Sequence, residues 1–274
     1  MTDSPREPPR GSADSLVLHA TDNGVSWITL NRPEAMNAVT WDQRERVISL
    51  LSDASADPAV RAVVITATGK GFCAGADLRG APSTGDRVAG DVARMIRLGA
   101  QRLISAVLDC EKPVIAAVNG TAAGIGAHLA LACDLVLAAE SAKFVEVFVR
   151  RGLVPDGGGA YLLPRLIGPQ RAKELMFFGD SLPATEAVLL GLVNRVVPAE
   201  ELTATARAWA ERLAQGPTRA LALTKQLVNA SLESDRATAF AAEATAQEIN
   251  MTTSDANEGV ASFVERRTPK YRGL

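Results

Sequence analysis

The feature that most constrains the fold of this chain is a nearly uninterrupted apolar run, Pro113-Val-Ile-Ala-Ala-Val118. A strand of this composition has no polar face to turn toward water, so it is buried on both sides, as in a parallel sheet covered by helices. Asn119-Gly120 turns the chain directly after the run, and residues 124–133 have the composition of a helix. We therefore expect an α/β core in which strands and helices alternate.

The same succession of strand and helix recurs on both sides of this run. Further strands are expected at 25–30, 61–66 and 134–138. One helix is expected to begin at Thr40, where Gln43 completes a capping box, and another is expected over 91–109. This recurrence predicts several similar units along the first two thirds of the chain.

The pattern divides the chain into three regions. Residues 1–15 are polar and Pro-rich, and they are predicted to be a disordered tail. Residues 16–200 are predicted to form the α/β core. Residues 201–274 show mainly helical patterns, and such a region either caps its own domain or crosses a subunit interface.

Composition argues against several functional classes. The formal net charge is −2 and no basic cluster occurs, so nucleic-acid binding is not expected. Three cysteines without CxxC spacing and only two histidines make a poor set of zinc ligands, so no metal site is expected. The sequence contains neither a signal peptide nor a run of about 18 apolar residues, which predicts a soluble cytoplasmic protein that does not enter a membrane.

One Gly-rich segment, Gly120-Thr-Ala-Ala-Gly124-Ile-Gly126, has the spacing with which short-chain dehydrogenases hold a dinucleotide. Here it lies in the middle of the chain, whereas those enzymes carry it after the first strand. Ala138-Ala139 stands where an acidic residue would bind the ribose, and Tyr161 is followed four residues later by Arg165 instead of Lys. A redox enzyme is therefore disfavoured.

A second Gly-rich segment, Gly71-Phe-Cys-Ala-Gly-Ala-Asp-Leu78, suggests a different function for the segment at 120–126. Both segments join a strand to a helix, and the first N–H groups of a helix have no partner inside it. If the two junctions lie side by side, two N–H groups can converge on one oxygen atom and form an oxyanion hole. The alternative is that both segments are only tight turns.

Taken together, the motifs of this chain resemble those of the crotonase (enoyl-CoA hydratase/isomerase) superfamily from about Leu16 to the end. The matching pieces are residues 30–38 (LNRPEAMNA), 71–78 (GFCAGADL), 112–120 (KPVIAAVNG), 133–135 (CDL), 152–155 (GLVP), 163–165 (LPR) and 191–194 (GLVN). The resemblance implies a spiral of repeated ββα units followed by C-terminal helices that support trimers or hexamers. It also implies an acyl-CoA thioester as substrate, with coenzyme A entering only as part of that substrate and no tightly bound cofactor.

The resemblance assigns roles to individual residues. It implies that the N–H groups of Ala74 and Ile125 bind the thioester oxygen, with Gly124 and Phe148 in the substrate pocket. It implies coenzyme A contacts along two segments and near the C-terminus, where a residue can approach the nucleotide of a neighbouring subunit. These coenzyme A contacts are Arg32, Asn37, Ala38, Ala74, Asp77, Leu78, Phe263 and Lys270.

The sequence departs from the hydratases of this superfamily at both of their catalytic glutamates. His128 and Phe148 stand at those positions. A phenyl ring cannot act as an acid or a base, so ordinary hydration is disfavoured. Glu146, two residues from Phe148, is expected to face the opposite side and to be a poor substitute.

Asp156, directly before Gly157, matches the aspartate that related isomerases use to move a proton along the acyl chain. One carboxylate suffices for that chemistry, because the group that takes the proton can return it to another carbon. The alternative is that Asp156 only caps the helix expected after it. His128 is either a second proton-transfer group or a histidine buried in the core.

We therefore expect an enoyl-CoA double-bond isomerase, with residues 79–91 shaping the acyl pocket. The runner-up is a hydratase with an atypical site that uses His128, Asp156 or both. A coenzyme A-linked dehalogenase is disfavoured, because Phe148 replaces its tryptophan and residues 79–127 contain no histidine. A non-catalytic or RNA-binding relative is also disfavoured, because the two oxyanion segments and Asp156 are retained.

Overall fold

The computed structural model describes residues 13–80 and 88–274, which contain two β-sheets. The larger sheet has the strand order β1 (Val17–Asp22), β2 (Val25–Leu30), β3 (Ala62–Ala67), β5 (Val114–Val118), β7 (Leu135–Ala139) and β10 (Arg195–Val197). The smaller sheet has the order β4 (Gly71–Cys73), β6 (Thr121–Ala123), β8 (Lys143–Val145) and β9 (Ser181–Pro183). The chain passes repeatedly from one sheet to the other, so the strands of the two sheets alternate along much of the sequence.

The middle of the chain repeats a unit of two strands followed by a helical segment. β3 is followed by β4 and then by α3 (Asp91–Ile96), a π-helical stretch (Arg97–Gln101) and α4 (Arg102–Leu108). β5 is followed by β6 and α5 (Ile125–Leu131), and β7 by β8 and α6 (Gly159–Phe178). In each unit the first strand joins the larger sheet and the second joins the smaller one. The predicted α/β fold of repeated ββα units is thus confirmed.

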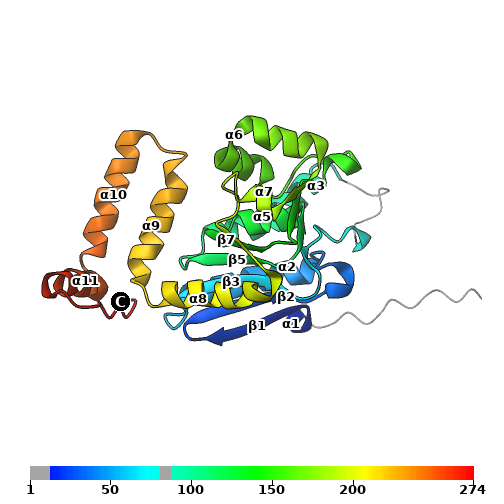
Figure 1. Ribbon diagram of the computed structural model, residues 1–274. Helices are drawn as coiled ribbons and strands as arrows, with labels where there is room; N and C mark the ends of the chain where they lie inside the picture. The colour runs from blue at the N-terminus through cyan, green and yellow to red at the C-terminus, as the bar shows by residue number, and fades with distance from the viewer. Residues whose placement is uncertain (1–12, 81–87) are drawn as a thin grey trace, which may run out of the picture.

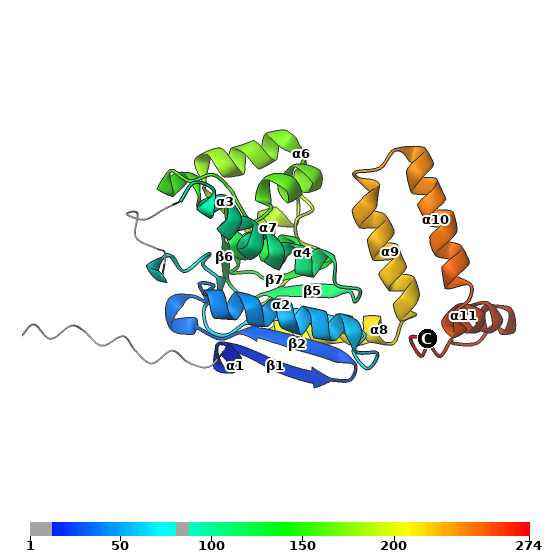
Figure 2. The same cartoon turned by 180° about the vertical axis from the view of Figure 1, so that it is seen from behind.

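The central strands β3 and β5 of the larger sheet are buried on both faces, as the apolar run of β5 predicted, whereas the edge strand β1 is mostly exposed. Its strands from β2 to β10 are parallel, and only β1 pairs antiparallel with β2. Val63 and Ile65 of β3 face one apolar core, while Ala62 and Val64 face the other. Helix α2 (Trp41–Ala56) supplies part of the first core, and α8 (Leu202–Ala214) covers the second (Figures 1 and 2).

The C-terminal helices stand beside this core. Figures 1 and 2 show α9 (Thr218–Ser231), α10 (Arg236–Asn250) and α11 (Ser254–Glu265) on one side of the two sheets. The remaining helices are α1 (Ala13–Leu16) and the short α7 (Ala184–Ala187). The predicted C-terminal helical region is thus present, although its first helix, α8, packs on the larger sheet. In the part of the chain that the structure describes, no helix combines the length and the apolar character needed to cross a membrane.

The sequence correctly predicted a local feature in which side chains bond to the backbone of nearby residues. The capping box predicted at Thr40 is present, with the Thr40 hydroxyl accepting from the Gln43 N–H and the Gln43 amide oxygen accepting from the Thr40 N–H. The short strands β4, β6 and β8 were not predicted, because three residues are too few to show a period. Residues 1–12 of the predicted tail, and 81–87 of the predicted pocket loop, lie outside the described residues; residues 13–15 belong to α1 rather than to a disordered tail.

Arg61, just before β3, connects the core to the C-terminal region. Its Nε donates to the Thr218 hydroxyl at 2.9 Å and its Nη2 to the Gly216 carbonyl at 2.5 Å. Its Nη1 donates to the carbonyl of Tyr271 at 3.3 Å. One guanidinium therefore contacts both the start of α9 and the C-terminal segment.

We expect Arg61→Ala to lower the free energy of unfolding by about 1–3 kcal/mol, because it leaves partly buried carbonyl groups without donors. Urea unfolding followed by circular dichroism measures this change. Arg171→Ala is the matched control, because Arg171 is exposed and pairs only with Glu174 on its own helix. Equal stability of the two variants would show that Arg61 does not hold the C-terminal region in place.

Candidate active site

The candidate site lies at the carboxyl ends of three short parallel strands. β4 pairs with β6, and β6 pairs with β8, all in the same direction. The segments that leave these strands, residues 74–77, 124–125 and 146–148, therefore emerge at one edge of the smaller sheet. The sheet thus brings together groups that lie far apart in the sequence.

The approach of the first two segments is close. A Cβ atom at Gly126 would collide with the carbonyl oxygen and side chain of Cys73, so only glycine allows α5 to pack there. A Cβ atom at Gly75 would lie 3.2 Å from the Ala123 carbonyl oxygen. The two Gly-rich junctions are therefore side by side, as the oxyanion-hole hypothesis requires.

The structure corrects one of the two predicted oxyanion donors. The Ala74 N–H donates to the carbonyl of Met36 at 2.9 Å, so it is not available to a substrate. The N–H groups of Ala76 and Ile125 have no acceptor among the described residues, and Ala76 is exposed. The N–H group without an acceptor in this loop therefore lies two residues after the one that the motif indicated. The Gly75 carbonyl accepts from the Val39 N–H, and the Asp77 N–H donates to the Val39 carbonyl. In this parallel pairing the N–H group of Ala76, the residue between them, points away from the segment that carries Val39.

His128 lies on α5, one turn after Ile125, and its side chain is fully buried. Its Nε2 is 3.1 Å from Oε2 of Glu146, which is only 4% exposed. Its ring stacks on Phe148, with centroids 5.4 Å apart and planes inclined by 11°. Gly124 is next to the same phenyl ring, since a Cβ there would lie 3.6 Å from it. Phe148 and Gly124 are thus adjacent, and their place in a substrate pocket stays a prediction.

The predicted orientation of Glu146 was wrong. Strand β8 ends at Val145, and Phe148 has a helical φ of −56°. Residues two apart share a face even in an extended strand, so the expectation of opposite sides did not follow from the side-chain alternation. In the structure both Glu146 and Phe148 contact His128.

Asp156 is half-buried in the loop that precedes α6. Burial raises the pKa of this carboxyl, and it outweighs the opposing effects of a positive charge on His128 and of the Gly157 N–H. Asp156 is not the cap of α6: the N-cap is Gly158, and no side chain caps this helix. The capping alternative is therefore not supported, and the Asp156 carboxyl is left for another role.

The Asp156 loop packs directly on the His128 ring. A Cβ at Gly157 would lie 3.2 Å from Nδ1 of His128 and 2.9 Å from Cδ1 of Ile125. A Cβ at Gly159 would collide with the ring at Nε2. The structure thus joins the three predicted residues Ile125, His128 and Asp156 in one site.

The predicted coenzyme A segments also meet, because Val39 bridges to Ala76. Arg32 donates to the Ala38 carbonyl at 2.7 Å and to Asp77 at 2.9 Å. The pKa of Asp77 is held below its usual range mainly by the hydrogen bond from Arg79, which outweighs partial burial, and further by Arg32. Arg32, Ala38, Asp77 and the exposed Leu78 therefore lie on one surface beside the N–H group of Ala76.

Asn37 does not belong to that surface, which corrects its predicted contact with coenzyme A. Its side chain is fully buried. Its Oδ1 accepts from the Arg32 N–H at 2.7 Å, and its Nδ2 donates to the carbonyls of Thr68 and Gly71, both at 2.8 Å. Asn37 therefore fixes the turn that carries Arg32, and its buried side chain is not presented to a ligand.

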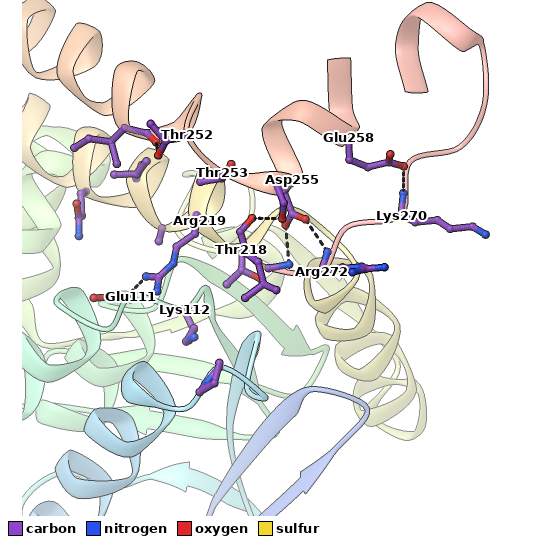
Figure 3. A pocket seen from close by; sticks show the side chains of 18 of the residues that line it. Glu111, Lys112, Thr218, Arg219, Thr252, Thr253, Asp255, Glu258, Lys270 and Arg272 are labelled. Atoms are coloured by element: carbon purple, nitrogen blue, oxygen red, sulfur yellow. Dashed lines mark hydrogen bonds and ion pairs between the residues drawn. The ribbon is translucent and has the colours of Figure 1, made fainter. Parts of the chain in front are cut away.

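Phe263 and Lys270 are apart from this cluster. Phe263 is 85% exposed on α11, and the Lys270 N–H donates to Glu258 at 2.8 Å. Lys270 borders a cleft of about 1400 Å³ between the C-terminal helices and the core (Figure 3). None of the predicted catalytic residues lines this cleft, so it is not the candidate site. Among residues 13–80 and 88–274, no cluster of three His, Cys, Asp or Glu side chains could hold a metal ion.

We expect Gly159→Ala to destabilise the fold by about 1–3 kcal/mol, because the new methyl group overlaps a buried ring that cannot move away. Gly99→Ala is the control. Its Cβ would meet only the tip of the Arg44 side chain, which can shift, so we expect little change. Urea unfolding compares the two variants. A Gly159→Ala protein as stable as Gly99→Ala would show that His128 is not held tightly under the Asp156 loop.

The comparisons with known proteins agree with this geometry. The family model described as enoyl-CoA hydratase/isomerase matches residues 20–273. The 1,2-epoxyphenylacetyl-CoA isomerase of Escherichia coli K12 is 39% identical, over 94% of this chain and 98% of the relative. The crotonyl-CoA hydratase of Syntrophomonas wolfei is 37% identical, over 94% and 98%. The crystal structure of an enoyl-CoA hydratase/isomerase from Cupriavidus metallidurans CH34 is similar with a TM-score of 0.89 and 38% identity, over 94% of this chain and 97% of that one. This chain therefore belongs to the enoyl-CoA hydratase/isomerase family, the crotonase superfamily that its motifs indicated.

Proposed function

We propose that this enzyme is an enoyl-CoA double-bond isomerase in which Asp156 moves the proton. The observation that carries the proposal is that Asp156 is a half-buried carboxyl beside the oxyanion segments and caps no helix. The two positions at which hydratases carry glutamates hold His128 and Phe148. Glu146 is buried against His128, so Asp156 is the more accessible carboxyl of the site, and one carboxyl is what a double-bond shift requires.

The proposed reaction starts from a 3-enoyl-CoA. The Asp156 carboxylate takes a proton from C2, and the electron pair moves into the thioester to give a dienolate. The N–H groups of Ala76 and Ile125 stabilise the negative oxygen, an effect worth about 10²–10³-fold in rate for one donor. Asp156 then returns the proton to C4, which leaves the double bond between C2 and C3. No atom is gained or lost.

A hydratase remains the second candidate, because some relatives bear that name, including the crotonyl-CoA hydratase of Syntrophomonas wolfei. Hydration needs a group that positions water at C3. His128 is fully buried beneath the Asp156 loop, so it cannot do so in this arrangement. The similarity to 1,2-epoxyphenylacetyl-CoA isomerase supports the isomerase proposal.

We further propose a cytoplasmic homo-oligomer, a trimer or a pair of trimers, that binds its substrate through the coenzyme A moiety. The C-terminal helices and the chain end expose many large apolar side chains, which suits them to subunit contacts. These side chains are Val228, Leu232, Phe240, Ile249, Val260, Phe263, Val264 and Leu274. In such an assembly Phe263 and Lys270 would reach the nucleotide of a neighbouring subunit.

We expect Asp156→Asn to lower the rate of 3-enoyl-CoA isomerisation about 10²-fold or more, because the amide cannot accept the C2 proton. The assay follows 3-enoyl-CoA to 2-enoyl-CoA conversion, with hydration of 2-enoyl-CoA measured in parallel. Asp180→Asn is the control, because Asp180 is a surface aspartate. Robust hydration by the wild type that survives Asp156→Asn would refute the isomerase proposal in favour of the hydratase.

We expect kcat/KM for isomerisation to fall as the pH drops through the pKa of Asp156, because only the carboxylate can take the proton. Burial raises this pKa, so the loss should begin at a higher pH than for an ordinary aspartate. A pH profile of the wild type measures this. An acid limb that begins no higher than for an exposed aspartate would show that Asp156 is not the group being titrated.

A further inference from the structure

Trp41, the first residue of α2, exposes an indole ring close to the first oxyanion segment. Its side chain is 58% exposed. Val39, two residues earlier, forms the bridge to Ala76, and the Asp77 N–H donates to the Val39 carbonyl at 2.9 Å. Trp41 therefore lies just beyond the backbone pairing beside the Ala76 N–H, to which the proposed reaction assigns the thioester oxygen.

The indole is supported on one face by Arg44 of the same helix. The guanidinium carbon of Arg44 lies 3.9 Å from the centroid of the Trp41 ring, and the Arg44 side chain is only 12% exposed. Arg44 packs in turn on the π-helical stretch before α4, since a Cβ at Gly99 would collide with its Nη1. Because Trp41 is largely exposed although Arg44 covers one face, the opposite face of the indole is open to a ligand.

The direction of the neighbouring helices brings α3 to this end of α2. Helices α2 and α4 lie side by side and run in the same direction. Arg102, which begins α4, donates to Glu45 at 2.7 Å, and the N–H of Glu111, after the end of α4, donates to the Ser55 hydroxyl at 3.0 Å. Helix α3 precedes α4, so it flanks the end of α2 that carries Trp41 (Figure 2).

The nearby part of α3 and of the π-helical stretch presents apolar side chains. Met95 lies one helical turn before Gly99, so it shares the helix face that packs on Arg44. Met95 is 47% exposed, and Leu98, directly before Gly99, is 56% exposed. Trp41, Met95 and Leu98 thus gather around one contact. Exposed apolar surface of this kind is typical of ligand-binding grooves.

The same helical segment continues to the proposed base. Ile104 of α4 is buried, and a Cβ at Gly158 would lie 3.4 Å from its Cγ2. Gly158 belongs to the Asp156 loop. A substrate whose thioester oxygen lies at the Ala76 N–H and whose C2 lies at Asp156 would therefore have this segment alongside it. The indole of Trp41 would then be exposed to the acyl group.

We propose that Trp41 is a specificity-determining residue that stacks on the acyl group, and that the enzyme prefers acyl groups carrying a flat conjugated or aromatic ring to straight chains. This inference rests on the proposed function, because it takes an acyl-CoA thioester as the substrate. Two aromatic rings in offset contact gain more than the buried area alone provides, whereas an alkyl chain gains only from its area. An indole already supported by Arg44 makes that contact with little loss of side-chain freedom.

The test measures binding and does not depend on turnover. Phenylacetyl-CoA and octanoyl-CoA carry the same number of acyl carbons, and neither has an alkene for the enzyme to shift. By isothermal titration calorimetry we expect Trp41→Leu to bind phenylacetyl-CoA about 3- to 10-fold more weakly than the wild type, with little change for octanoyl-CoA. Trp41→Phe, which keeps an aromatic ring, should retain most of the affinity. Equal losses for both thioesters in Trp41→Leu, or no loss, would overturn the inference.

Free coenzyme A tests whether the indole contacts the nucleotide instead of the acyl group. We expect Trp41→Leu to bind free coenzyme A as the wild type does. A loss as large as that for phenylacetyl-CoA would place the indole on the nucleotide and refute its contact with the acyl group. Phe177→Leu is the matched control, because it removes an exposed aromatic ring from α6 and should leave the affinities for all of these ligands unchanged.

The activity assay distinguishes this inference from the proposed function. If the wild type does not isomerise 3-enoyl-CoA but Trp41→Leu selectively loses phenylacetyl-CoA, the function fails and the substrate class stands. If the wild type isomerises and Trp41→Leu binds both thioesters unchanged, the function stands and the inference fails. If both hold, kcat/KM for a 3-enoyl-CoA that bears a phenyl group should fall more in Trp41→Leu than kcat/KM for a straight-chain 3-enoyl-CoA.

Discussion

The parallel pairing of β4, β6 and β8 is the interaction on which the rest of the site depends. Each strand has only three residues, yet their pairing places three separate segments at one edge of a sheet. The free N–H groups, the His128 ring and its two contacts, Glu146 and Phe148, all come from those segments or from the helix that follows β6. Three-residue strands cannot hold this order alone, so they depend on the larger sheet that the same chain builds beside them.

Close backbone approach is the second constraint. Gly126 lets α5 pack on β4, and Gly159 lets the Asp156 loop pack on the His128 ring. In both places any side chain would separate elements that must touch. The Gly-rich segments therefore admit the neighbouring backbone, and the N–H groups of Ala76 and Ile125 beside them have no acceptor among the described residues.

Residue roles carried over from a motif can fail at the level of single atoms. The motif indicated the Ala74 N–H as an oxyanion donor, but this group is already bonded inside the protein, whereas the Ala76 N–H has no acceptor among the described residues. The motif also indicated Asn37 as a coenzyme A contact, but its side chain makes three hydrogen bonds inside the protein. A sequence motif records which residues recur in a segment, whereas a hydrogen bond depends on where the neighbouring segment lies.

The sequence by itself determined the α/β class, the strand-and-helix units, the capping box at Thr40 and the replacement of two catalytic glutamates by His128 and Phe148. These features depend on local composition, on apolar periodicity and on side chains that act on nearby backbone. Only the tertiary structure decided that Glu146 turns inward to His128 and that Asp156 is free of a capping role. The first depends on where α5 packs against the end of β8, and the second on where α6 begins; packing between distant segments fixes both, and local propensity does not.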